Sequence, residues 1–107
     1  MNVDHVISMF IAQGKGGPFG LWEIVKVVKE ELGVQKNAEI WSQSMQIVRA
    51  LLQSGIRAGD SPYTNRGDFV AWPDNELEAI VARIENEWVN SSREPNLPDS
   101  PWFGPDA

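Results

Sequence analysis

Few residues in this chain have the chemistry expected of a catalytic or metal site. His5 is the only histidine and cysteine is absent. Acid–base catalysis near neutral pH usually relies on histidine, and structural zinc sites need several Cys or His ligands. His5 lies near the start of the chain among helix-spaced apolar residues, so we expect a structural role for it. We therefore predict no enzyme activity, no catalytic residue, no metal site and no cofactor.

The glycine-rich run at residues 14–20 invites comparison with a phosphate-binding loop. Such a loop needs Gly, four residues, Gly, then Lys and Ser or Thr, and it leads from a strand into a helix. Here Lys15 directly follows Gly14, no Ser or Thr closes the run, and apolar helix spacing precedes it. We interpret the run as a connector, although an anion could sit on the open N–H groups that follow Gly20.

Carboxylates are the most abundant charged groups, and they are unevenly placed. The net charge is −6; residues 1–58 carry six basic and five acidic residues, whereas residues 59–107 carry three basic and ten acidic ones. A negative half repels phosphate backbones and anionic lipids, and it attracts basic surfaces. Glu78 and Glu85 lie seven residues apart on one outward helix face, with no second catalytic group beside them. A docking surface for a basic partner is the prediction, and a merely solvated face is its alternative.

Apolar spacing predicts four helices and one hairpin. The helices cover roughly residues 3–13, 21–32, 37–53 and 76–90, with Asn2, Asn37 and Asp74 as caps, Gly33 as a left-handed stop and Gly55 as the third helix's end. Short strands are expected at 56–58 and 69–72, joined by a long exposed tip. The fold class is therefore mainly α within α+β: three helices, a β-hairpin and a C-terminal helix, in a winged-helix arrangement. A plain helical bundle with an irregular loop is the alternative.

One domain is expected at residues 1–90, followed by a proline-rich tail at 91–107. The tail contains Pro95, Pro98, Pro101 and Pro105, which should forbid regular structure because proline lacks a backbone donor. Trp102 and Phe103 are expected to anchor the tail on the domain.

A winged-helix arrangement would make the third helix a candidate for reading DNA. Its outer residues are Ser42, Gln43, Gln46, Arg49 and Gln53, and Gln and Arg can read base edges. Phosphate contacts need several Lys or Arg side chains, however, and the sequence pI is about 4.6. The charge balance thus disfavours nucleic acid as a partner. A winged-helix transcription regulator acting as a homodimer remains the alternative function.

A further indication comes from a sequence resemblance that covers about the C-terminal half. The run 51–59, then Gly67-Asp68-Phe69, Trp72, Trp88 and Pro101-Trp102-Phe103 resemble a pattern found in small bacterial proteins catalogued only as a domain of unknown function. Those proteins are similar to winged-helix folds and to immunity proteins that accompany secreted toxins. The resemblance implies that kind of fold and role, and it transfers no catalytic motif.

Together these features predict a cytoplasmic protein-binding module. The lack of cysteine, of a basic leader and of any apolar stretch near 18 residues favours that location and no membrane contact. The function predicted is that of an immunity or adaptor protein that binds and neutralises a basic partner, such as a toxin nuclease. A small enzyme using a carboxylate alone is a third, least favoured, possibility. The predicted partner contacts are Asp60, Tyr63 and Asp68 in the hairpin, Glu78 and Glu85 on the last helix, and Trp102 and Phe103 in the tail.

Overall fold

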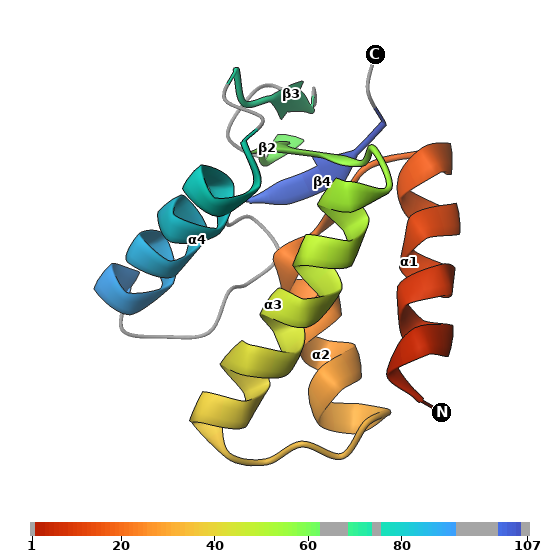
Figure 1. Cartoon of the computed structure of the whole chain (residues 1–107), viewed down its shortest axis with the longest axis vertical. Helices are drawn as coiled ribbons and strands as arrows, with labels where there is room; N and C mark the ends of the chain where they lie inside the picture. The colour runs from red at the N-terminus through yellow and green to blue at the C-terminus, as the bar shows by residue number, and fades with distance from the viewer. Residues whose placement is uncertain (1, 63–68, 74–75, 92–100, 106–107) are drawn as a thin grey trace.

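Helices surround one face of a small antiparallel sheet in the computed structural model, which describes residues 2–62, 69–73, 76–91 and 101–105 (Figure 1). The elements are α1 (Val3–Gly16), β1 (Phe19–Gly20), α2 (Leu21–Glu30), α3 (Asn37–Gln53), β2 (Arg57–Asp60), β3 (Val70–Ala71), α4 (Leu77–Ser91) and β4 (Trp102–Gly104). The chain is therefore α+β and mainly helical, as predicted. No helix in these described ranges is both long and apolar enough to span a membrane.

The helices form where apolar residues recur at helical spacing, and their ends follow local hydrogen bonding. The Asn2 side chain accepts from the His5 backbone N–H at 2.9 Å, which confirms it as the cap of α1. Asn37 is wrong as a cap, because α3 already includes it and Lys36 precedes the helix without a side-chain bond. Gly33 has φ +69°, so the predicted left-handed stop after α2 is confirmed.

The glycine-rich run does not end α1 where the sequence predicted. The helix continues to Gly16, and Gly14 is buried within it. A Cβ at Gly14 would lie 3.0 Å from the Ile56 side chain, so the missing side chain lets α1 pack closely against the residue that precedes β2. The run then ends in β1, a strand that the sequence did not predict.

The C-terminal tail supplies a central strand of the sheet. The strand order is β1-β4-β2-β3, and Phe103 of β4 lies opposite both Phe19 and Ala58 in antiparallel register. The expectation that prolines forbid regular structure throughout the tail is wrong, because Pro101 and Pro105 flank the three strand residues without interrupting them. The Pro101 carbonyl even accepts from the Leu21 N–H at 3.1 Å. The predicted β2–β3 hairpin is confirmed by antiparallel pairing of Gly59 with Ala71.

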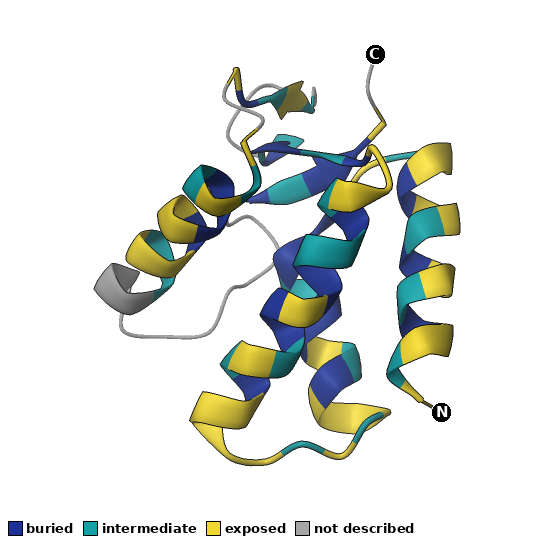
Figure 2. Cartoon of the chain, in the orientation of Figure 1, coloured by how far each residue is buried: buried dark blue, intermediate teal, exposed yellow. Residues whose placement is uncertain are grey.

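Three phenylalanines tie the sheet to the first helix. Phe19 stacks on Phe10 with ring centroids 5.1 Å apart and meets Phe103 at 5.8 Å. All three rings are essentially buried, and buried residues line the inner faces of the helices and β4 (Figure 2). On the other side of the core, Trp41 of α3 and Trp88 of α4 form an edge-to-face pair at 5.0 Å, a favoured aromatic geometry.

Phe103→Ala should destabilise the protein strongly. The side chain is 0% exposed, and truncating a buried Phe typically lowers the free energy of unfolding by about 3–5 kcal/mol. Urea denaturation measures this change. Val70→Ala, at a strand position 45% exposed, is the control and should cost no more than about 1 kcal/mol. A loss below about 1 kcal/mol for Phe103→Ala would show that β4 is not part of the core.

Candidate partner-binding surface

Asp60, predicted as a partner contact, is half-buried and binds the hairpin's tryptophan. Trp72 is 3% exposed, and its indole N–H donates to Asp60 Oδ1 at 2.9 Å. Arg57 donates to the Trp72 carbonyl at 2.7 Å, and the Arg83 guanidinium lies 3.7 Å from the indole centroid, within cation–π range. These contacts fasten the β2–β3 hairpin to α4. The Asp60 carboxylate is thus used within the fold.

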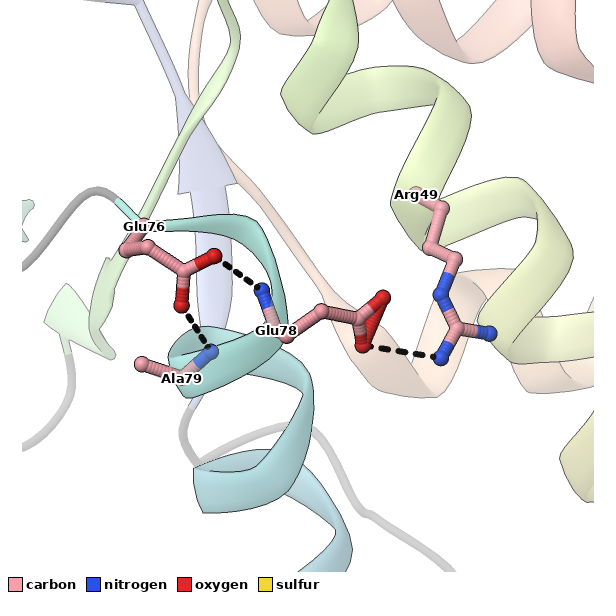
Figure 3. Close-up of polar contacts among 4 residues, drawn as sticks. All are labelled: Arg49, Glu76, Glu78 and Ala79. Carbon is pink, nitrogen blue, oxygen red and sulfur yellow. Dashed lines mark hydrogen bonds and ion pairs between the residues drawn. The ribbon is translucent and has the colours of Figure 1, made fainter.

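Glu78, a second predicted contact, is exposed but paired. Its Oε2 lies 3.3 Å from Arg49 Nη2, and both side chains remain well exposed (Figure 3). Such a surface ion pair typically contributes about 0–1 kcal/mol, so a partner could displace it at small cost. The pair also neutralises Arg49, the only cation among the predicted base-reading residues of α3.

Another carboxylate, that of Glu76, caps the start of α4. Glu76 accepts from the backbone N–H groups of Glu78 at 3.2 Å and Ala79 at 2.8 Å (Figure 3). Backbone donors in a helix's first turn have no partner inside the helix, and a carboxylate there satisfies them and complements the helix dipole. Asp74, the predicted cap, lies outside the described residues.

Further along α4, Glu85 differs from its neighbours. Glu87 pairs with Arg83 at 3.4 Å, one helical turn away. Glu85 is exposed and makes no hydrogen bond or ion pair within the described part of the chain. Of the predicted carboxylate contacts that can be placed, it is therefore the one whose charge is uncommitted.

The two aromatic predictions in the tail have different outcomes. Phe103 is fully buried, so the expectation that it contacts a partner is corrected: the side chain fills the core between β1 and β2. Trp102 is half-buried beside Gly20, where a Cβ would lie 2.8 Å from its Nε1 and 2.5 Å from Trp22 Cδ1. Glycine is required there because two indoles approach the backbone. Tyr63 and Asp68 lie outside the described residues.

A hollow between α1 and α2, which the sequence did not predict, has a volume of about 240 Å³. Its apolar lining comes from Met9 and Phe10 of α1 and from Trp22 and Val27 of α2. Phe10 is buried, whereas Met9 is 37% exposed and is one of only two large apolar side chains in the described residues with such exposure. The hollow thus offers accessible apolar surface beside charged side chains.

Three carboxylates, one lysine and the amide of Gln13 form the polar part of the lining of this hollow. The charged residues are Glu23, Glu30 and Glu31 with Lys26. Glu30 is the last residue of α2 and Glu31 its C-cap, and both are exposed. The C-terminal end of a helix already carries partial negative charge, so carboxylates there are locally unfavourable and concentrate negative potential.

Glu23, near the N-terminal end of α2, is less exposed to solvent than Glu30 and Glu31. Burial raises the pKa of its carboxyl, while a 3.4 Å hydrogen bond from Gln13, a backbone contact at Gly20 and the nearby Lys26 charge act in the opposite direction. The desolvation of a carboxylate next to an apolar surface is the dominant effect. A cation brought into the hollow would therefore meet a carboxylate that is incompletely solvated.

The sequence contained a partial signal for this hollow. Trp22 and Val27 make the apolar stripe of α2 wider than its core-facing side needs, and Met9 lies off the stripe of α1. Glu30 and Glu31 are adjacent in the sequence and point in different directions on a helix, which gives them no signal as a catalytic pair. What was missing was the packing angle that brings α1 beside this flank of α2.

Comparison with known proteins yields no relative: no family model, curated protein or solved structure matches this chain. Within the residues that the structure describes, no group of three or more His, Asp or Glu side chains is arranged to hold a metal ion. Function is therefore inferred from the geometry and charge of the surfaces described above.

Asp60→Ala should destabilise the hairpin, because it leaves the buried Trp72 N–H without its acceptor. An unsatisfied buried donor costs about 1–3 kcal/mol, measurable as a lower free energy of unfolding in urea. Asp60→Asn keeps an oxygen that can accept from the indole and should lose clearly less. Equal losses for the two variants would contradict the assigned hydrogen bond.

Glu23→Gln should change how stability depends on pH. Because burial raises the pKa of this carboxyl, the folded chain binds its proton more readily than the unfolded chain does. The stabilisation that comes from proton binding to Glu23 is complete below the pKa that this carboxyl has in the unfolded chain. It is lost as the pH rises through the pKa that the carboxyl has in the folded chain. The variant should therefore gain stability relative to the wild type as the pH rises above the ordinary carboxyl pKa of about 4, measured by urea denaturation at a series of pH values. A relative loss of stability with rising pH would contradict the burial effect.

Proposed function

We propose that this chain is a protein-binding module, of the immunity or adaptor kind, that binds and neutralises a basic partner such as a toxin nuclease. The observation that supports it is that, among the described residues, exposed carboxylates without a partner outnumber exposed ammonium groups without one. In the described part of the chain, five exposed carboxylates make no hydrogen bond or ion pair, those of Asp4, Glu30, Glu31, Glu39 and Glu85, against three such ammonium groups, those of Lys15, Lys26 and Lys36. Such a surface steers basic molecules toward it and repels anionic ones.

The winged-helix assignment belongs to the same proposal. The order of α1, α2 and α3 followed by the β2–β3 hairpin supports it, and the position of β4 between β1 and β2 is an addition to that arrangement. Two contacts weigh against the alternative of a homodimeric DNA-binding regulator. Trp88 of α4 packs on Trp41 of α3, and Glu78 neutralises Arg49 on the helix that would enter the groove. The proposed module acts without catalysis, metal or cofactor.

The proposal is tested by the charge of the partner and the salt dependence of binding. We expect the protein captured by this chain from its natural cells to be basic and to bind directly when both are purified. Since exposed charges are screened beyond about 8 Å at 0.15 M ionic strength, the Kd measured by calorimetry should rise on the order of tenfold between low and high salt.

Two outcomes would contradict the proposal. One is a neutral or acidic direct partner with a salt-independent Kd. The other is retention of the pure chain on duplex DNA at near-physiological salt, which would favour the regulator alternative because non-specific DNA binding is dominated by phosphate contacts.

A further inference from the structure

We infer that the hollow between α1 and α2 is the place where the partner docks, and that it takes a segment presenting one large apolar side chain next to a lysine or arginine. This inference rests on the proposed function and adds to it a site and a recognition chemistry. The predicted contacts on the hairpin and α4 are not part of this site.

The size and lining of the hollow suit a single apolar anchor. A dry cavity of about 150 Å³ accepts a benzene ring, so about 240 Å³ accommodates one Leu, Met or Phe side chain and excludes a folded loop. Met9 lies at the exposed edge, and methionine is flexible and polarizable, which suits it to contacts with varied side chains. Trp22 adds a large, stiff surface, the residue type enriched at the centres of protein interfaces.

Charge complementarity is the reason for expecting a lysine or arginine next to the apolar anchor. Three carboxylates and one lysine line the hollow, and the lysine side chain acts on Glu23. Glu30 and Glu31 make no ion pair within the described residues, so the carboxylates of the lining outnumber its one lysine at the negative end of α2. A guanidinium or ammonium group placed there gains two carboxylates and the helix dipole together.

The spacing along α2 sets the spacing expected in the partner. Val27, in the apolar lining, precedes Glu30 and Glu31 by three and four residues, which is one helical turn or about 5.4 Å. A helical partner segment should thus carry its basic residue three or four positions from the apolar anchor, and an extended one about two positions away. A second copy of this chain is a poor occupant, since its own net charge of −6 would be repelled.

Selection from a random 12-residue peptide display library against the full chain tests the inference. We expect enrichment of Lys or Arg at the stated spacing from Leu, Met or Phe. Titration of a selected peptide, followed by amide NMR, should shift the signals of Met9, Gln13, Val27 and the Trp22 indole N–H. Enriched sequences without basic residues, or shifts confined to other surfaces, would overturn the site.

Matched charge variants separate this site from general electrostatics. E30Q/E31Q should weaken peptide binding roughly tenfold, because two rim charges are lost. D4N/E39Q removes the same total charge from the first turns of α1 and α3 and should leave the Kd within about twofold. Val27→Phe, which fills the hollow, should also weaken binding, provided that its circular dichroism matches the wild type.

The outcomes also separate the inference from the proposed function. If basic peptides bind but E30Q/E31Q weakens them no more than D4N/E39Q does, the site is wrong while the basic-partner function stands. If selection enriches no basic residues at all, both are contradicted. Self-association of the chain through the hollow, seen as concentration-dependent shifts of the Met9 and Val27 signals, would overturn the assigned occupant.

Discussion

The placement of β4 between β1 and β2 is the constraint on which the rest of the structure depends. Only three residues form this strand, yet Phe103 pairs with Phe19 on one side and Ala58 on the other. Its ring then contacts the phenylalanine stack that reaches α1. The last strand therefore joins segments that are some 40 residues apart in sequence, and a single buried aromatic side chain connects the sheet to the helices.

Charge is distributed by this architecture in a way that composition alone does not reveal. Although the C-terminal half is strongly acidic, four of its five described carboxylates make contacts within the fold: Asp60 accepts from a buried indole, Glu76 satisfies the start of α4, and Glu78 and Glu87 pair with arginines. Among the described residues, most carboxylates without such a contact lie in the N-terminal half. At the end of α2 two of them lie beside exposed apolar surface, and this combination is the basis of the proposed docking site.

Helices were predicted well because their signals are local. Apolar spacing located all four, and side-chain capping by Asn2 and the left-handed stop at Gly33 were readable from residue type. The hairpin was also predicted, since turn-forming residues separate two short β-prone runs. β1 and β4 were missed because two- and three-residue strands carry no periodic signal, and because their pairing is defined by partners distant in the chain. Phe103 was assigned to a partner surface for that reason.

The sequence by itself determined the amphipathic helices, the acidic net charge and the near absence of histidine and cysteine, since each depends on residue type and short-range spacing. Only the tertiary structure decided which carboxylates are consumed by internal contacts and which remain uncommitted, because an ion pair such as Arg49–Glu78 joins residues from different helices. It alone also placed Met9 beside Trp22 and Val27. A hollow between two helices depends on how their axes pack, and that geometry is fixed by the whole core rather than by either segment.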